Sequence, residues 1–118
     1  MTKLDGWIGH PHEVLATWYQ VPMMSLAKRR AGLEELTAAH NRLPIGTLVR
    51  VTHLANGKSV KVRITDRGIH DHRVKLDLCK EAAEELEMVG KGIARVRMEV
   101  LDENGETPPL PATVAAQP

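Results

Sequence analysis

The sequence has little of several residue types that mark common protein classes. Phenylalanine is absent, and the aromatic residues are Trp7, Trp18 and Tyr19. A single cysteine, Cys79, excludes an intramolecular disulfide framework and any multi-cysteine zinc site. No apolar run approaches the ~20 residues that a membrane-spanning helix needs. The core must therefore be built from aliphatic residues, a composition that suits β-strands.

Net charge is also low, because the two signs nearly cancel. The chain has 16 basic and 15 acidic residues and a formal net charge of +1, so we expect no nucleic-acid partner. Its 118 residues, 42% of them hydrophobic, are enough for one globular domain. The first residues form no apolar signal-peptide core, which predicts either a cytosolic protein or one whose signal segment has been removed.

The clearest local structure is a β-hairpin. Asn56-Gly57 lies between two alternating segments, Leu48–Leu54 and Ser59–Thr65, and both residues tolerate the positive φ that a tight hairpin turn requires. The alternation predicts a core-facing set, Val49, Val51, Val60, Val62 and Ile64. It predicts a solvent-facing set of Arg50, Thr52, Lys61, Arg63 and Thr65.

Further elements follow from periodicity and composition. We expect strands at Glu13–Tyr19, Arg73–Leu78 and Ile93–Leu101, and one short α-helix at about residues 79–88. Asp77 or Cys79 lies near the start of that helix, where a carboxylate would satisfy unpaired backbone N–H groups. A second helical segment around residues 25–34 is left open, and residues 36–40 suit either a helix or a strand.

The densest polar segment is Asp66-Arg67-Gly68, directly after the hairpin. A carboxylate at a strand end can project into a cleft, although Asp-Arg-Gly is also ordinary turn chemistry. The downstream pair His70 and His72 and the earlier pair His10 and His12 have a His-x-His spacing that is compatible with a metal site. Their spacing implies no further ligand, so we predict no metal and no other cofactor.

Six segments in order resemble the rare lipoprotein A family. They are Ala16-Thr17-Trp18-Tyr19, Leu36-Thr37-Ala38-Ala39-His40, Leu54-Ala55-Asn56-Gly57-Lys58, Asp66-Arg67-Gly68, Leu76-Asp77-Leu78 and Gly90-Lys91-Gly92-Ile93. The resemblance implies a mainly β fold, a six-stranded double-psi β-barrel over residues 14–103, with residues 36–40 as a barrel strand. Residues 1–13 would then be an N-terminal extension, and residues 104–118 a proline-rich tail or linker.

The resemblance also implies a function in the periplasm or cell envelope. Members of the family include lytic transglycosylases, which cleave the bond between N-acetylmuramic acid and N-acetylglucosamine in peptidoglycan and leave 1,6-anhydromuramyl ends. The expected partner is the peptidoglycan glycan strand, bound by a monomer. The alternative is a catalytically silent, expansin-like glycan-binding barrel, because the Gly-Glu motif of the family has no clear counterpart in this sequence.

Site residues carry over only where the motifs match. Asp66 and His40 match catalytic positions of the family, and Glu34 is the predicted substitute for the missing glutamate, with Glu35 as its alternative. The predicted substrate-binding residues are Trp18, Tyr19, Thr37, Arg67 and Gly68.

Overall fold

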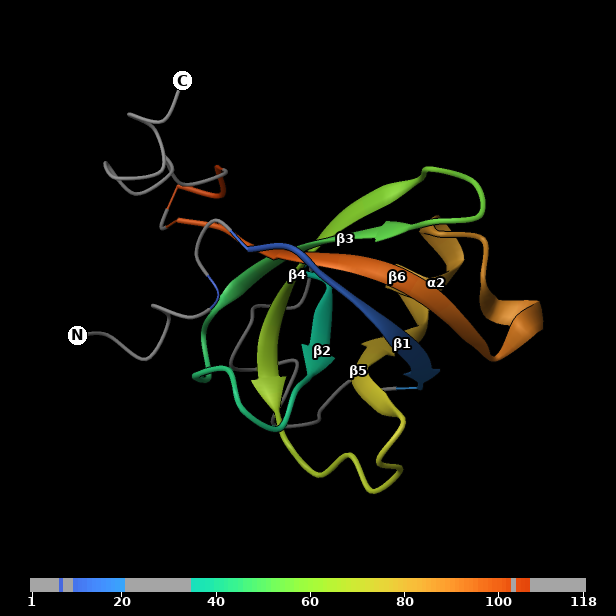
Figure 1. Ribbon diagram of the computed structural model, residues 1–118, viewed down its shortest axis with the longest axis horizontal. Helices are drawn as coiled ribbons and strands as arrows, with labels where there is room; N and C mark the ends of the chain where they lie inside the picture. The colour runs from blue at the N-terminus through green and yellow to red at the C-terminus, as the bar shows by residue number, and fades with distance from the viewer. Residues whose placement is uncertain (1–6, 8–9, 21–34, 103, 107–118) are drawn as a thin grey trace.

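The computed structural model describes residues 7, 10–20, 35–102 and 104–106 (Figure 1). Its strands are β1 (His12–Tyr19), β2 (Thr37–Ala39), β3 (Leu48–His53), β4 (Ser59–Asp66), β5 (Val74–Cys79) and β6 (Ile93–Val100). They form a closed barrel in the order β1-β5-β2-β4-β3-β6. The prediction of a mainly β, six-stranded barrel is confirmed. The suggested helical segment around residues 25–34 lies outside the described residues.

Two parallel strand pairs, β1 with β5 and β2 with β4, close the barrel, and the other four pairings are antiparallel. The β3–β4 hairpin forms as predicted, and Gly57 at its turn has φ +76°. β2 is a strand because β4 and β5 hydrogen-bond to it on both sides. Pairing with these neighbours therefore overrides the local propensity of this segment, which favours a helix.

The core is aliphatic, as the composition requires. Val49, Val51, Val62 and Ile64 are fully buried, whereas Val60 is half-buried. The prediction that Thr65 faces solvent is wrong, because this residue is 1% exposed. Its pairing explains the difference: Ala38 pairs with Ile64 and Ala39 pairs with Asp66, so Thr65 is the extra residue of a β-bulge.

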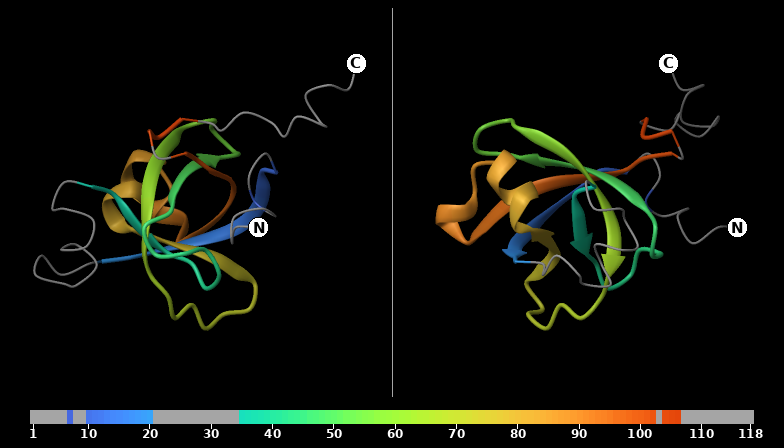
Figure 2. Two further views of the ribbon diagram at one scale, coloured as in Figure 1. Left: turned by 90° about the vertical axis from the view of Figure 1, so that its left-hand side faces the viewer. Right: turned by 180° about the vertical axis from the view of Figure 1, so that it is seen from behind.

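The helix α2 (Lys80–Glu85) is shorter than predicted and lies outside the barrel (Figure 2). After it the chain turns at Glu87, which has φ +58°, and forms the 3₁₀-helix η1 (Val89–Lys91). The carbonyl of Leu86 ends the helix because it accepts hydrogen bonds from outside it. The partners of this oxygen are Nδ1 of His53 at 2.8 Å and Nδ2 of Asn56 at 3.0 Å.

Asp77 does not cap this helix, contrary to one of the two sequence-based expectations. The N-cap residue of α2 is Cys79, which forms no side-chain capping hydrogen bond. Asp77 instead lies within β5, where it pairs with Thr17 of the neighbouring strand β1. Among the described residues, no helix is long and apolar enough to cross a membrane.

Candidate active site

Two carboxylates lie on one outer face of the barrel. Asp66 in β4 pairs with Ala39 in β2, Ala39 pairs with Asp77 in β5, and Asp77 pairs with Thr17 in β1. Residues in register on neighbouring strands point to the same face of a sheet. We call these four residues the acidic row. Because Ala39 separates the two aspartates, their Cα atoms are about two strand spacings, roughly 10 Å, apart.

Each aspartate of the acidic row follows a β-bulge. Thr65 forms the bulge that precedes Asp66. In the other parallel pair, Leu15 pairs with Val74 and Ala16 with Leu76, so Lys75 is the extra residue. Bulges re-aim the side chains beside them and are common next to active sites. Each parallel pair therefore has a carboxylate within two residues of its bulge.

Asp77 is held by a direct hydrogen bond. Oγ1 of Thr17 donates to Oδ1 of Asp77 at 2.7 Å, and both side chains are half-buried. Burial raises the pKa of the Asp77 carboxyl, and the bond from Thr17 opposes this shift. Asp77 therefore keeps its proton to a higher pH than an ordinary aspartate, as a general acid requires.

Tyr19 lies two residues beyond Thr17 on the same face of β1. Burial raises the pKa of its phenol to about 12, and the negative charges of Asp66 and Asp77 act in the same direction. The hydroxyl is therefore neutral at physiological pH and can donate a hydrogen bond near both carboxylates.

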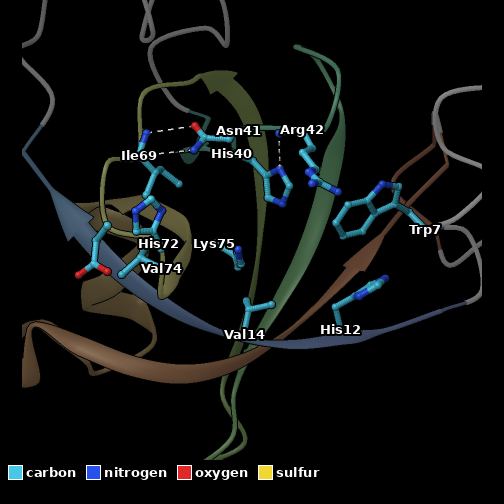
Figure 3. A pocket seen from close by; sticks show the side chains of 11 residues that line it. Trp7, His12, Val14, His40, Asn41, Arg42, Ile69, His72, Val74 and Lys75 are labelled. Atoms are coloured by element: carbon cyan, nitrogen blue, oxygen red, sulfur yellow. Dashed lines mark hydrogen bonds between the residues drawn. The ribbon is translucent and has the colours of Figure 1, made fainter.

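His40 directly follows Ala39, but its ring lies in a cavity at the barrel mouth (Figure 3). The residue is 3% exposed, and its Nδ1 accepts hydrogen bonds from the amides of Arg42 and Leu43, both at 3.0 Å. Burial lowers the pKa of the His40 imidazole to about 4, and nearby cations, first of all Arg67, add to this effect. The ring is thus neutral and holds the turn that follows β2.

The loop after Asp66 is fastened to the loop after His40. Nη1 of Arg67 donates to the carbonyls of His40 at 3.0 Å and Leu43 at 2.8 Å. Oδ1 of Asn41 accepts from the amide of Gly68 at 3.0 Å. The same oxygen accepts from the amide of Ile69 at 3.1 Å, and Nδ2 of Asn41 donates to the Ile69 carbonyl at 2.8 Å (Figure 3). We call these bonds the loop clamp. It fixes the chain on the C-terminal side of Asp66, where Gly68 has φ +99°.

The acidic row and the loop clamp lie within the segment that matches a known family. A family model described as lytic transglycolase matches residues 12–98. The chain belongs to this family. Curated relatives support the assignment and confirm the resemblance to rare lipoprotein A. The chain is 54% identical over 97 residues to the probable endolytic peptidoglycan transglycosylase RlpA of Nostoc sp., covering 82% of this chain and 23% of the relative.

A second relative is the endolytic peptidoglycan transglycosylase RlpA of Campylobacter jejuni, which is 38% identical over 98 residues. This match covers 80% of the chain and 35% of the relative, so the chain spans about a quarter to a third of the length of these two proteins. The likeness extends to solved structures at lower identity. The apo expansin of Clavibacter michiganensis superposes with a TM-score of 0.63 at 20% identity, covering 86% of this chain and 54% of that one.

Cerato-platanin 3 from M. perniciosa superposes with a TM-score of 0.65 at 14% identity, covering 79% of this chain and 97% of that one. At such identities these structures support the fold alone. Together with the family match, they agree with the predicted double-psi β-barrel.

The substrate-binding residues predicted from the family motifs have varied surroundings. Nε1 of Trp18 donates to the Val89 carbonyl at 3.1 Å, and Nζ of Lys80 lies 6.0 Å from the centre of its ring. Thr37 is 1% exposed, and its amide donates to Sγ of Cys79 at 3.3 Å. The guanidinium of Arg67 belongs to the loop clamp. Tyr19 and Thr37, each two residues from a member of the acidic row on the same strand, share the face of the row, and of these two Thr37 is fully covered.

The glutamate of the family's Gly-Glu motif has no described counterpart in the row. Glu34 lies outside the described residues. Glu35, its alternative, forms a two-bond ion pair with Arg63, in which Nε and Nη2 each donate at 2.8 Å. This pairing occupies both oxygens of the Glu35 carboxylate.

The sequence analysis did not select Asp77 or Thr17 as site residues. A local signal for Asp77 was present, since it is an acidic residue between two leucines in a predicted strand. Its partner Thr17 is 60 residues away in the sequence, so only the barrel brings the two together. The four histidines considered as metal ligands form no site here, because the described residues contain no group of three metal-binding side chains.

Proposed function

We propose that this domain is a peptidoglycan lytic transglycosylase that works through Asp66 and Asp77. The observation that carries the proposal is the acidic row, with two half-buried carboxylates on one face on either side of Ala39. The family match, and relatives named as peptidoglycan transglycosylases, support the reaction class. Such a domain would act in the periplasm or cell envelope, where its substrate lies.

The reaction needs one proton donor and one proton acceptor. The C6 hydroxyl of the muramyl residue attacks its own C1, the bond from C1 to O4 of N-acetylglucosamine breaks, and a 1,6-anhydro ring forms. Asp77, whose pKa burial raises, gives its proton to the departing O4. Asp66 takes the proton of the C6 hydroxyl. The proton gained by Asp66 and the one lost by Asp77 exchange with water after the product leaves.

The spacing of the acidic row suits this arrangement. Glycosidases that place an oxygen nucleophile between two carboxyls hold them about 6.5–9.5 Å apart, whereas enzymes with direct carboxylate attack hold them closer. Cα atoms roughly 10 Å apart let the side chains of Asp66 and Asp77 reach that range. The gap over the small side chain of Ala39 would then receive the glycosidic bond.

The neighbouring side chains would position the reacting groups. Thr17 orients the Asp77 carboxyl through its 2.7 Å hydrogen bond. Tyr19 presents a half-buried aromatic ring on the same face, which suits contact with a sugar ring, whereas its hydroxyl oxygen is buried. Through the loop clamp, Arg67 and Asn41 fix the position of Asp66 without touching the substrate.

The second candidate is a glycan-binding barrel without catalysis. The observation that favours it is the ion pair of Glu35 with Arg63, which removes one of the two carboxylates considered for the missing glutamate position. Under this alternative the acidic row would bind sugar hydroxyls by hydrogen bonds, and no glycosidic bond would break.

The deciding experiment is incubation with peptidoglycan sacculi followed by mass spectrometry. We expect 1,6-anhydromuramyl products from the wild type and none from Asp66→Asn. The matched control is Asp102→Asn, because Asp102 follows β6, a strand that contributes no residue to the row, and its asparagine can still accept the amides of Asn104 and Glu106. Retained binding to sacculi without anhydro products from the wild type would refute the enzyme and support the glycan-binding barrel.

A further inference from the structure

Apart from the acidic row, the molecule has a cavity at the barrel mouth, with a volume of about 370 Å³ (Figure 3). Its wall includes Arg42, Lys75, His12 and Trp7. We infer that this cavity binds a carboxylate group carried by the muramyl residue of the glycan strand. The inference rests on the proposed function and assigns the barrel mouth as a substrate subsite.

Two cations that line the cavity have no acidic partner within the part of the chain that the structure describes. No carboxylate of the described residues forms an ion pair with Arg42 or Lys75. Asp71 also lines the cavity, but Arg73 holds its carboxylate through a bond of 2.8 Å from Nη2. An anion entering the cavity would therefore meet two available positive charges.

The cations around His40 also indicate a positive electrostatic potential in the cavity. After burial, the causes that lower the pKa of its imidazole are the positive charges of Arg67, Arg42 and Lys75, followed by His12. A field that disfavours a proton on His40 favours an anion at the same place.

His12 supplies a polar atom that lacks a protein partner. Its Nε2 is buried, and among the described residues no group forms a hydrogen bond to it. Buried polar atoms without partners cost free energy, so they often mark a place where a ligand or water binds. In the tautomer with the proton on Nε2, this atom can donate to a carboxylate oxygen.

Trp7 adds an apolar wall beside these polar groups. Its ring centroid lies 4.4 Å from that of His12, and its edge contact with His40 has a centroid distance of 5.3 Å. A carboxylate attached to an apolar or ring-shaped group fits this combination better than a free inorganic anion does. The muramyl residue has that chemistry, in its lactyl group or in the stem peptide attached to it.

The cavity adjoins the acidic row along two strands. His40 follows Ala39 of the row, and Lys75 precedes Asp77 by two residues, which is roughly 7 Å along a strand. The bulge residue Lys75 is itself part of the cavity wall. A strand with its glycosidic bond over Ala39 would thus place a muramyl substituent within reach of the barrel mouth.

The test is a titration of the ¹⁵N-labelled full chain that follows the indole N–H resonance of Trp7 by NMR, assigned with Trp7→Phe. The probes are N-acetylmuramic acid, with a lactyl carboxylate, N-acetylmuramyl-L-alanyl-D-isoglutamine, with a peptide carboxylate, and N-acetylglucosamine, with neither. We expect saturable shifts with at least one carboxylate probe and none with N-acetylglucosamine. The probe that binds identifies the source of the carboxylate.

Charge removal supplies the matched comparison. Arg42→Gln and Lys75→Gln should each raise the Kd of the binding probe about tenfold, the scale of a charge-assisted hydrogen bond. Arg95→Gln removes the same charge from an exposed position on β6 and should leave the Kd within about twofold. An equal response to N-acetylglucosamine, or an unchanged Kd in both cavity variants, would overturn the inference.

The sacculus assay separates this failure from that of the proposed function. Anhydromuramyl products without carboxylate binding would refute the subsite and leave the catalytic proposal standing. Carboxylate binding without such products would support the subsite and refute the catalysis.

Discussion

The acidic row and the barrel mouth differ although consecutive residues contribute to them. Ala39 belongs to the row, and His40, the next residue, lies in the mouth. The row is acidic and half-buried, with Thr17 bound to Asp77. The mouth is cationic and aromatic, and its histidine is fixed by two backbone amides. A motif that is continuous in the sequence is thus divided between two faces by strand alternation.

The two regions therefore have different expected roles. The row holds carboxyl groups that can exchange protons with a substrate, whereas His40 stays neutral and shapes the chain around Asp66. The His40 amide also donates to the Asp66 carbonyl at 3.0 Å, so the histidine supports the aspartate through the backbone. Removing an aspartate of the row should affect catalysis, and removing His40 or a clamp residue should affect stability first.

The largest effect is expected from Asp77→Asn. Loss of a general acid lowers a rate by roughly 10²–10⁴-fold, so kcat for anhydromuramyl formation should fall by that factor. Asparagine keeps the acceptor oxygen for Thr17, so the fold should be intact. The rate measurement on sacculi should be paired with circular dichroism. A variant with near wild-type kcat would show that Asp77 is not the general acid. The proposed difference in role between the acidic row and the barrel mouth would then be wrong.

His40 should make stability depend on pH. Its folded pKa of about 4 lies below the ordinary value of 6.5, so its stabilising contribution is complete above pH 6.5 and is lost as the pH falls towards 4. The free energy of unfolding should decrease by up to about 3 kcal/mol over that interval. Urea denaturation at several pH values measures the slope.

The control for this prediction is His40→Gln. The variant should be less stable at pH 7 by about 1–3 kcal/mol, because two amides lose their acceptor. Its unfolding free energy should vary less between pH 6.5 and 4 than that of the wild type. An equal slope in both proteins would show that another group is responsible.

The loop clamp links the two regions, so Asn41→Ala should disturb both. Three hydrogen bonds to Gly68 and Ile69 are lost, and because they are exposed we expect a cost of about 1–2 kcal/mol. The rate on sacculi should also fall, since Asp66 loses part of its support. The melting temperature and kcat of the same preparation check both effects. A loss of stability with full activity would show that the clamp does not position Asp66.

The smallest effect concerns the stability of Asp77→Asn. Because burial raises the folded pKa of Asp77, its ionisation opposes folding, and the wild type loses stability as the pH rises through that pKa. The variant should therefore be slightly more stable than the wild type at pH 7, within about 0.5 kcal/mol for a half-exposed site. The gain should disappear in acid, where Asp77 is protonated. Thermal unfolding at pH 7 and pH 3 tests the sign.

Local sequence was sufficient for much of the fold. The β3–β4 hairpin follows from Asn56-Gly57 and from the alternation of valines, which depends on neighbouring residues only. The short helix was expected to end about three residues later than it does, because contacts from His53 and Asn56 to Leu86 determine where it ends. The burial of Thr65 could not be read from alternation, since the bulge exists only in the pairing with β2.

The sequence by itself determined most of the strands, the β3–β4 hairpin, an aliphatic core and a carboxylate at the end of β4, because strand periodicity and turn chemistry are local properties. The barrel was predicted from the resemblance to the rare lipoprotein A family, not from these local patterns. Tertiary structure alone decided that Asp66 and Asp77 lie on the same face, that Thr17 binds Asp77 and that His40 lies on another face. These relations arise where β1, β2, β4 and β5 pair across long sequence separations. Pairings between strands so far apart in the sequence cannot be read from local sequence patterns.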